Sequence, residues 1–511
     1  MDVTKYNAHL VYPDFKEQIR RCEFVAMDQE MTGVNIAGED RVSGLSPEET
    51  YLRLRNAVLK YNAFQFGICL FTKAANGGYE VRPYNFFLLK KNGFLVFDNS
   101  AIPFHVQHKL DFHKWFSAGI PYCTKDEEET ATQRGFPVPI DDAEKKQLNT
   151  LLTAVQQWYA GDEAVLDVQI PCSMHFASVV RYHFDNVNKD LCITFTISGA
   201  PYFAEPVKFH FERASEEAFQ KKLEGKQADQ HNQLLKKIGF RLFWKEIIAS
   251  KKPIVGHNFF QDLMFMLNMH ESDLPEDYAT FKRYTCALFP SIYDTKSIAS
   301  QLVCKFPVTH LGVLYNQCRS LFGMSASQFS RYFYLPPGFY EYDDEYIKVS
   351  AKAHEGAYDA YMTGVVFIYF QQYKEILDSR KNLLCIFAAT HFFNNGIAVD
   401  PFYEDTYMIT SKGHLFIDQV ESVLFNMENR RADFETNGKV DFKKINYLVS
   451  IVNPNEHNQS NLFCVTYKSG GDNENTMKKI EVYKTRSKES NLLSLHEHEI
   501  NFIPIAQYFS S

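Results

Sequence analysis

Pairs of cysteines with the C-x-x-C spacing of zinc ribbons and thioredoxin-like motifs are absent from this sequence. Its ten cysteines are scattered over 511 residues, and a chain of this length does not need disulfide staples. We therefore expect reduced and mostly buried thiols in an intracellular protein.

Long apolar runs are also lacking. Stretches such as residues 383–393 fall short of the roughly 20 residues that a membrane-spanning helix needs. The first residues do not form the charged-then-apolar pattern of a signal peptide. The expected protein is soluble, without a membrane span.

The chain has no excess of basic residues, since its net charge is −8. This argues against a nucleic-acid binder whose affinity rests on a uniformly basic surface. A site that binds divalent cations through carboxylates is itself acidic, so a local basic track remains compatible with this total. The content of 45% hydrophobic and 23% charged residues is ordinary for globular proteins, and the length predicts two to four domains.

What is present first is an α/β pattern. Residues 14–21 read as helical, and the apolar run 24–27 predicts a buried strand. Ser46, followed by Pro47 and Glu49, forms a capping box with a proline start, which predicts a helix over about 47–60. Two strands at 64–71 and 82–89 follow, joined by turn residues at 75–78.

The α/β pattern resumes near residue 238, after an interruption. The later elements are predicted as helix 243–248, strand 253–255, helix 259–267, a strand over 286–295 and an aromatic-rich helix over 358–373. The interruption comprises a surface linker at 122–140, a compact unit at 141–200 and a charged helix or mobile connection at 212–233. Within the unit, helices are expected at 142–159 and 176–184 and a strand at 191–197. A domain inserted into an α/β fold explains this order.

Residues 383–511 differ in pattern and predict a separate small αβ domain. Its elements are a helix at 415–426 and strands at 447–452, 462–467 and 480–483, separated by Gly- and Asn-rich turns.

Asp28 and Glu30 come directly after the predicted strand at 24–27. An i, i+2 pair on a strand points both side chains to the same face, where two carboxylates repel each other unless cations lie between them. The motif alone is also compatible with a solvated strand end. The same spacing occurs in polar surroundings at Asp126/Glu128, Asp343/Glu345, Asp433/Glu435 and Asp472/Glu474.

Asp262 falls one turn into the helix predicted after Gly256 and His257. Asn258 is a good N-cap residue, and a carboxylate in the first turn suits the helix dipole. In isolation, Asp262 also fits an ordinary early-helix aspartate.

His354 and Asp359 lie five residues apart, which is about 140° of helical rotation. Both side chains would diverge inside one helix. Gly356 therefore favours a loop position for His354 and a helix-start position for Asp359, which lets the histidine fold back toward the same site. A structural histidine is the alternative.

Together, the order Asp-x-Glu, Asp, His-x-x-x-x-Asp resembles the DEDD exonuclease superfamily, in its histidine subgroup. That resemblance implies an RNase H-like fold in which Asp28, Glu30, Asp262 and Asp359 bind two metal ions, Mg²⁺ with Mn²⁺ as a substitute. It also implies that His354 acts as general base near neutral pH.

Further segments resemble the poly(A)-specific ribonuclease family, which includes trimmers of small-RNA (piRNA precursor) 3′ ends. They are AMDQEMTG at 26–33, SPEETY at 46–51, FQFG at 64–67, GIPY at 119–122, KIGF at 237–240, IVGHN at 254–258, DTK at 294–296 and HEGAYDAY at 354–361. The resemblance implies 3′→5′ hydrolysis of single-stranded RNA to 5′-mononucleotides by a homodimer. It places the protein in the cytoplasm, with the nucleus or RNA granules as further sites.

The same resemblance implies three domains. They are an exonuclease domain at 1–125 plus 235–378, an inserted small nucleic-acid-binding-like domain at 141–200 and an RNA-recognition-motif-like domain at 383–511. In the insert, Arg181 and His183 stand two apart instead of in an Arg-x-x-x-His pattern. The C-terminal segment contains none of the three tryptophans, so no cap-stacking role can be carried over to it.

Single-stranded RNA requires stacking partners and cations near the site. The predicted substrate-binding residues are Met31, Phe64, Phe112, Phe259 and Lys296, with His113, Lys114 and Trp115 as further candidates. Core packing is the alternative for each aromatic. Two alternative functions remain open at this point, a catalytically silent RNA-binding protein and a DNA-directed 3′→5′ exonuclease.

Overall fold

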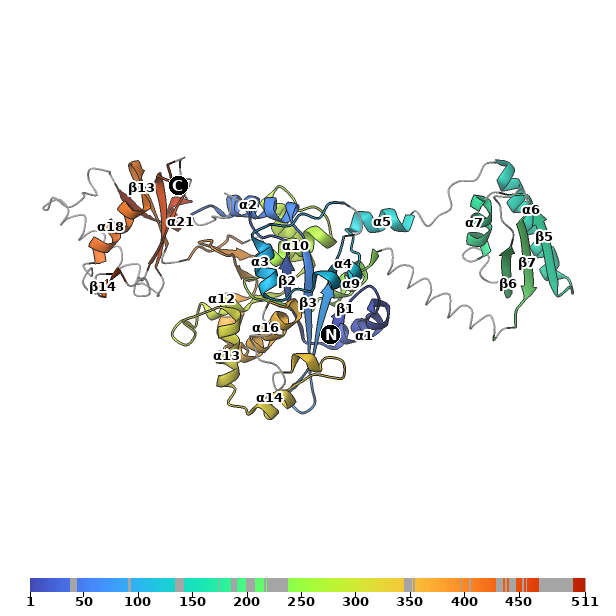
Figure 1. Cartoon of the computed structure of the whole chain (residues 1–511), viewed down its shortest axis with the longest axis horizontal. Coiled ribbons are helices and arrows are strands. Elements are labelled where there is room, and N and C mark those ends of the chain that lie inside the picture. Colours follow the sequence, from blue (N-terminus) through green and yellow to red (C-terminus); the bar gives the residue numbers. More distant parts are fainter. Residues whose placement is uncertain are drawn as a thin grey trace. The chain divides into compact units, whose positions relative to one another are not determined.

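A computed structural model gives the architecture of the chain (Figure 1). It describes residues 1–36, 44–90, 93–133, 142–172, 174–184, 191–198, 207–215, 217, 238–343, 352, 354–396, 398–403, 406–428, 435–436, 439–440, 447–452, 455, 457–467 and 500–510.

The central sheet contains the three strands predicted near the N-terminus. β2 (Phe24–Met31) pairs antiparallel with β3 (Ala63–Lys73), which pairs antiparallel with β4 (Tyr79–Phe87). β8 (Ile254–Gly256) lies parallel to β2, and β9 (Ile292–Asp294) lies parallel to β8. The order β4-β3-β2-β8-β9, three antiparallel strands followed by two parallel ones, is that of an RNase H-like α/β fold, as predicted.

Two short strands extend this sheet. β1 (Asp2–Val3) and β10 (Phe333–Tyr334) both pair with β4 in parallel.

The capping box also forms as predicted, because the Ser46 hydroxyl accepts from the Glu49 amide at the start of α2 (Pro47–Lys60). Hydrogen bonds of this kind satisfy amides that the first helical turn leaves unpaired.

Helices cover the two faces of the sheet. α16 (Gly356–Phe370) crosses β2 and β3 and is buried along its whole length, which agrees with the aromatic-rich helix that the sequence predicts. On the other face, Phe66 and Phe86 pack against Phe240 and Phe243 at the start of α9 (Arg241–Ser250). α1 (Ala8–Arg21) packs beside α9 and begins earlier than predicted.

The remaining elements around the central sheet connect these layers. They are α3 (Ala101–Gln107), α4 (Phe112–Ala118), α10 (Phe260–His270), α11 (Tyr278–Leu288), α12 (Thr295–Ala299), α13 (Leu311–Leu321), α14 (Ala326–Tyr332), the 3₁₀ turn η3 (Tyr340–Tyr342) and α17 (Lys374–Arg380). No helix among the described residues is both long and apolar enough to cross a membrane.

One predicted strand is wrong over most of its length. Residues 286–288 belong to α11, and only residues 292–294 form a strand. The Asp277 side chain caps α11 by accepting from the Thr280 amide, so this segment starts as a helix despite its apolar run.

The inserted segment forms a second compact unit, Cys123–Gly239. Three antiparallel strands in the order β5-β7-β6 pack on α6 (Asp142–Ala160) and α7 (Met174–Tyr182) around a core of their own. The strands are β5 (Val165–Ile170), β6 (Ile193–Ser198) and β7 (Val207–Arg213). The sheet thus extends beyond the predicted boundary at 200. Part of the predicted linker is a helix, α5 (Lys125–Gln133), and most of 212–233 lies outside the described residues.

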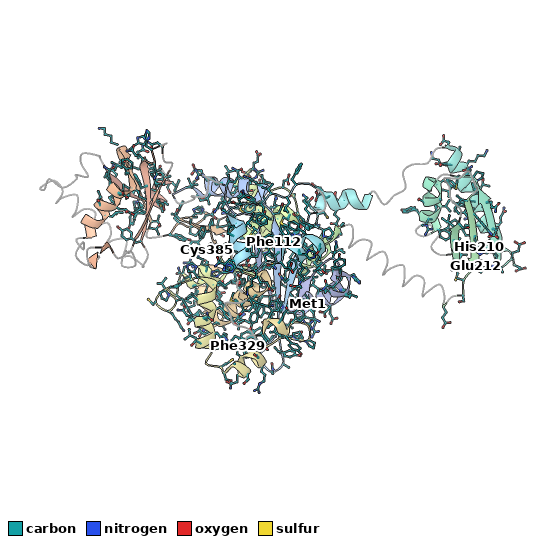
Figure 2. All side chains as sticks on the ribbon, in the orientation of Figure 1. Met1, Phe112, His210, Glu212, Phe329 and Cys385 are labelled. Atoms are coloured by element: carbon teal, nitrogen blue, oxygen red, sulfur yellow. The ribbon has the colours of Figure 1, made fainter. Side chains whose placement is uncertain are left out.

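The free face of the insert's sheet bears a carboxylate–histidine–carboxylate group (Figure 2). Nδ1 of His210 lies 2.5 Å from Asp167 and Nε2 lies 3.0 Å from Glu212, and these hydrogen bonds raise the pKa of His210. Lys208 pairs with Asp167 at 2.9 Å. This part of the face is therefore not a basic surface.

The C-terminal sheet has the order β16-β17-β13-β18. Its strands are β13 (Thr406–Leu415), β16 (Tyr447–Ile451), β17 (Ser460–Tyr467) and β18 (Asn501–Pro504), and α18 (Ile417–Glu428) follows the first. β14 (Glu435–Thr436) and β15 (Lys439–Val440) form a small hairpin. β13, in the middle of the sheet, was not predicted, and the predicted strand 480–483 lies outside the described residues.

The face of the C-terminal sheet that α18 does not cover is covered by other residues of the chain. Met408 and Cys464 pack with Ile505 of α21 (Ile505–Tyr508) and with Phe402 and Phe509. Bases that stack on a four-stranded recognition sheet need that face open.

The hairpin of β11 (Leu383–Cys385) and β12 (Phe392–Asn394) packs against the elements around the central sheet. Phe393 stacks on Phe260 and Phe281, and the Cys385 amide donates to Asp294 at 2.9 Å. The hairpin thus packs with the elements around the central sheet, although it falls within the range 383–511 predicted for a C-terminal domain.

Candidate active site

Asp28 and Glu30 lie on β2 and point to the face that α16 covers. They stand opposite Gly67 and Gln65 of β3, in the register of the antiparallel pair. Alternation along the strand puts both carboxylates on one side of the sheet, as the sequence predicts. The strand extends past both residues to Met31, so the pair sits within the strand instead of after it.

Asp359 reaches the same face from the first turn of α16. Gly67 permits this approach, because a Cβ atom at Gly67 would lie only 1.9 Å from the carbonyl oxygen of Gly356. His354 precedes the helix with φ of 67°, and its amide donates to Oδ1 of Asp359 at 3.3 Å. The predicted loop position of His354 and helix-start position of Asp359 thus both occur.

Asp262 joins from the first turn of α10. Its Oδ1 accepts a hydrogen bond of 3.0 Å from the amide of Gln29, which lies between Asp28 and Glu30. The predicted N-cap role of Asn258 is wrong: Asn258 has φ of 58°, and the helix begins after Phe259 without a side-chain cap.

Asp294, and not Asn258, supplies the side-chain acceptor at the start of this helix. Its carboxylate accepts from the amides of Asn258 and Phe259 at 3.0 Å each. It also accepts from Lys296, Ser297 and Cys385. This fully buried side chain fixes the strand-to-helix turn that carries Asp262.

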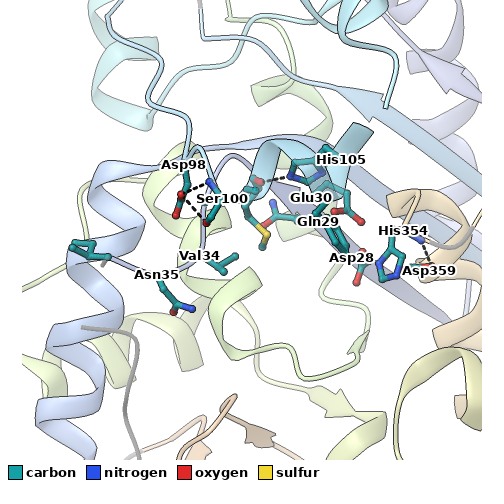
Figure 3. Close-up of a pocket in the computed structure, with 15 residues that line it drawn as sticks. Asp28, Gln29, Glu30, Val34, Asn35, Asp98, Ser100, His105, His354 and Asp359 are labelled. Atoms are coloured by element: carbon teal, nitrogen blue, oxygen red, sulfur yellow. Dashed lines mark hydrogen bonds between the residues drawn. The ribbon is translucent and has the colours of Figure 1, made fainter. Parts of the chain in front are cut away.

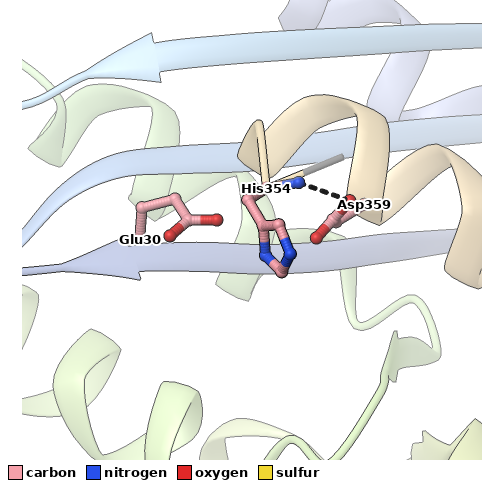
Figure 4. Close-up of side chains that lie close together, drawn as sticks. All are labelled: Glu30, His354 and Asp359. Atoms are coloured by element: carbon pink, nitrogen blue, oxygen red, sulfur yellow. Dashed lines mark hydrogen bonds between the residues drawn. The ribbon is translucent and has the colours of Figure 1, made fainter. Parts of the chain in front are cut away.

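The side chains of Glu30, His354 and Asp359 converge in space (Figure 4). A carboxylate oxygen of Glu30, a ring nitrogen of His354 and a carboxylate oxygen of Asp359 all lie within 4.8 Å of one another. Burial, followed by repulsion from Asp359 and Asp262, raises the pKa of Asp28 and Glu30. Burial likewise raises the pKa of Asp262 to about 8 and that of Asp359 to about 7.

Four carboxylates with raised pKa values need positive charge to ionise together. Within the described residues, no lysine or arginine forms an ion pair with Asp28, Glu30, Asp262 or Asp359. Oxygen-only donors of this kind match the ligands that Mg²⁺ and Mn²⁺ prefer. The donor set therefore fits divalent cations.

The imidazole of His354 is exposed at the site and touches α3. Its ring centroid lies 4.1 Å from that of His108 and 4.9 Å from that of Phe104. Partial burial, followed by the nearby His108 and His105, lowers the pKa of His354. The ring is therefore neutral near pH 7 and can accept a proton.

A cavity of about 700 Å³ opens from the carboxylates (Figure 3). Asp28, Glu30, His354 and Asp359 lie at one end. Val34, Asn35, Asp98 and Ser100 line the other, with Met31 and Phe104 also in the wall. Sequence reasoning missed α3 and residues 98–101, for which the only signal is a pair of histidines three residues apart.

The predicted substrate-binding residues divide into two groups. Met31 lines the cavity beside the carboxylates, and its contact with substrate stays a prediction. Phe64 is 0% exposed and Phe259 is 1% exposed, so neither ring can stack on a base, and both predictions are corrected. Phe64 instead packs on Trp115, which is itself buried.

Phe112 and Lys296 stand outside the residues that line this cavity. Phe112 packs at the edge of the cluster formed by Phe97 and Trp115. Lys296 lies close enough to His257 for its charge to lower the pKa of that buried imidazole, after desolvation. Lys114 pairs with Asp2.

The RNase H-like sheet carries carboxylates on β2, and two helices beside it carry two more. This combination of fold and site is typical of nucleases. The chain belongs to the CAF1 ribonuclease family, because residues 3–367 match the model of the CAF1 family ribonucleases.

Curated relatives agree with this family. The chain is 25% identical over 414 residues to the poly(A)-specific ribonuclease PARN of Xenopus laevis, covering 73% of this chain and 63% of that protein. It is 25% identical over 405 residues to the pre-piRNA 3′-exonuclease trimmer of Bombyx mori, covering 72% and 70%. The chain thus spans slightly less than two thirds of the frog protein's length.

Among solved structures, S. pombe Pop2p in a form with Mg²⁺ and Mn²⁺ bound matches with a TM-score of 0.35 and 14% identity. The match covers 75% of this chain and 97% of that one.

Proposed function

We propose that the protein is a 3′→5′ exoribonuclease that shortens single-stranded RNA by metal-dependent hydrolysis and releases 5′-mononucleotides. One observation carries the proposal. Asp28, Glu30 and Asp359 lie with His354 at the end of an open cavity, and Asp262 is close enough for its charge to raise the pKa of Asp28 and Glu30.

Asp28, Glu30, Asp262 and Asp359 would hold two Mg²⁺ ions, with Mn²⁺ as a substitute. Bound ions of this kind activate a water molecule and stabilise the leaving oxygen of the phosphodiester. The Gln29 amide orients Asp262, and the Asp294 carboxylate fixes the turn before it. The ligands are therefore largely in place through hydrogen bonds of the chain itself.

His354 would take a proton from the attacking water at its imidazole nitrogen. Its lowered pKa keeps that nitrogen unprotonated near neutral pH, as a general base requires. Its place at the rim of the cavity leaves the ring open to solvent, from which protons can be exchanged.

The cavity wall would receive the 3′ end of the RNA. Met31 and Phe104 offer apolar surface to a base, while Asn35, Asp98 and Ser100 offer hydrogen-bonding groups to a ribose or base edge. Phe112 and Lys296 would contact nucleotides of the RNA farther from its 3′ end. Contacts to a ribose hydroxyl distinguish RNA from DNA.

Two substrate classes follow from the relatives. PARN is named for poly(A) and the silkworm protein for piRNA precursors, so a poly(A) tail and a small-RNA precursor are both proposed substrates. We propose that the C-terminal sheet belongs to an RNA-recognition-motif-like domain, and its strand order β16-β17-β13-β18 supports this proposal. Because one face of that sheet is covered and the insert's free face is partly acidic, we assign the catalytic contacts with RNA to the exonuclease domain.

We further propose that the protein acts as a homodimer in the cytoplasm, with the nucleus or RNA granules as additional sites. Sedimentation equilibrium of the purified chain tests the dimer.

The decisive experiment is a time course on 5′-labelled single-stranded RNA with a 3′ oligo(A) or a mixed-sequence tail, in Mg²⁺ and in EDTA. A Mg²⁺-dependent ladder on oligo(A) alone indicates a deadenylase, and a ladder on both tails indicates a general 3′ trimmer. A substrate whose 3′ end consists of 2′-deoxyribonucleotides tests the DNA-directed alternative, and Asp28→Ala serves as control. A folded protein that retains RNA but makes no ladder would replace the proposal with a silent RNA-binding function.

A further inference from the structure

The ring of His354 is not fixed by its own segment. Its amide is tied to Asp359 at 3.3 Å, but within the described part of the chain the imidazole makes no hydrogen bond. The backbone has φ of 67°, a conformation that leaves the side chain without the support of a regular helix or strand. Another element must therefore determine where the ring points.

That element is α3. Phe104 lies in α3, and His108 is the C-cap residue that directly follows this helix. Their ring centroids lie 4.5 Å apart, and both rings touch the His354 ring edge-on, at 4.9 Å and 4.1 Å. His354 therefore has one aromatic contact within α3 and one at the C-terminal end of that helix.

α3 is itself anchored to the catalytic strand. His105, which is buried, lies 3.0 Å through Nε2 from the carbonyl oxygen of Met31 and packs edge-on against Phe64 at 4.9 Å. Met31 is the last residue of β2, one position after Glu30. The position of the His354 ring is therefore set relative to β2, the strand that carries Asp28 and Glu30.

We propose that His108 is a positioning residue for His354: its ring holds the imidazole of the general base in the orientation that proton transfer needs. This inference rests on the proposed function of the site. Phe104 shares the contact but also lines the cavity of about 700 Å³, whereas His108 lines a smaller neighbouring cavity with Glu30 and His354, so His108 is the better residue for testing the positioning effect.

His108 acts through packing and not as a metal ligand. Among the described residues, the group whose ligand atoms lie within 4.8 Å of one another comprises Glu30, His354 and Asp359, without His108. A phenylalanine at position 108 should therefore replace it, because a ring of similar shape keeps the edge-on contact.

The test compares His108→Ala, His108→Phe and the control Val106→Ala, an exposed position in α3 two residues before His108. For His108→Ala we expect kcat about tenfold lower, since small misplacements of a catalytic group are costly, with KM and Mn²⁺ affinity unchanged. His108→Phe and Val106→Ala should keep the wild-type kcat. Wild-type kcat in His108→Ala, or equal loss in His108→Phe, would overturn the proposal.

A second readout does not depend on activity. Diethyl pyrocarbonate modification of His354, followed on its peptide by mass spectrometry, should be several-fold faster in His108→Ala than in the wild type or His108→Phe. If the wild type makes no RNA ladder, the proposed function fails, yet this rate still decides whether His108 packs the ring. Equal rates in all variants would reject the positioning role.

Discussion

The amide of Gln29 donates a hydrogen bond of 3.0 Å to the carboxylate of Asp262, joining β2 to α10, a helix that follows the insert in the sequence. Because Gln29 lies between Asp28 and Glu30, the bond sets the spacing of three carboxylates with a single contact.

Replacing Asp262 should separate this architecture from its chemistry. Asp262→Asn keeps an oxygen for the Gln29 amide but removes a negative charge, so we expect a folded protein with activity at least about 100-fold lower, the scale of losing one electrostatic group in other active sites. The measurement is the initial rate of RNA shortening at saturating Mg²⁺. Circular dichroism serves as the folding control, and near wild-type activity in Asp262→Asn would remove Asp262 from the proposed ligands.

The raised carboxyl pKa values make a prediction about pH. A carboxyl whose pKa is higher in the folded than in the unfolded state stabilises the fold at low pH, and this contribution is lost as the pH rises through the folded pKa. With Asp359 at about 7 and Asp262 at about 8, the metal-free protein should lose stability between about pH 5 and pH 8. Adding Mn²⁺ should restore the melting temperature more at pH 8 than at pH 6.

Thermal melts in EDTA over this pH range measure the effect. Because buried histidines elsewhere also titrate, the informative quantity is the wild-type melting temperature minus that of Asp262→Asn. The difference should fall as pH rises. A constant difference would contradict the charge repulsion inferred for the cluster.

Asp294 should be far more important for stability than an ordinary capping residue. Its carboxylate accepts five backbone hydrogen bonds, and Asp294→Ala would leave these donors buried without a partner. We expect a loss of roughly 3 kcal/mol or more in the free energy of unfolding by urea. Asp111, which caps α4 through one bond to the Lys114 amide, is the matched control, with about 1 kcal/mol expected for Asp111→Ala.

Gly67 should be required for metal binding as well as for folding. In Gly67→Ala the new methyl group must push Gly356 away, which displaces the first turn of α16 and with it Asp359. We expect Mn²⁺ affinity, measured by calorimetry, to fall at least about tenfold. Gly312→Ala in α13, where a Cβ meets nothing within 4 Å, should leave that affinity unchanged and stabilise the helix slightly.

The sequence predicted those parts of the site that depend on local geometry. Alternation along a strand placed Asp28 and Glu30 on one face, and Gly356 indicated that His354 precedes the helix of Asp359. Their convergence with Asp262 came from the resemblance to a known family, because no single-residue pattern reports on distances between separate segments.

The missed parts depend on tertiary contacts. Nothing in the sequence around His108 shows that its ring meets His354. Phe64 and Phe259 were selected among 45 phenylalanines, and only packing decides which rings remain accessible. The cap expected from Asn258 was supplied instead by Asp294, a residue from the next strand.

The β11–β12 hairpin changes where the catalytic domain can be cut. The family match ends at residue 367, yet the Cys385 amide and the Phe393 ring complete the surroundings of Asp294 and Phe260. A recombinant fragment that stopped at the end of the match would expose these groups to water. A minimal catalytic fragment should therefore retain the chain through residue 403. Such a fragment keeps the whole hairpin and also the following segment, which pairs with it through the bridge between His391 and Phe402.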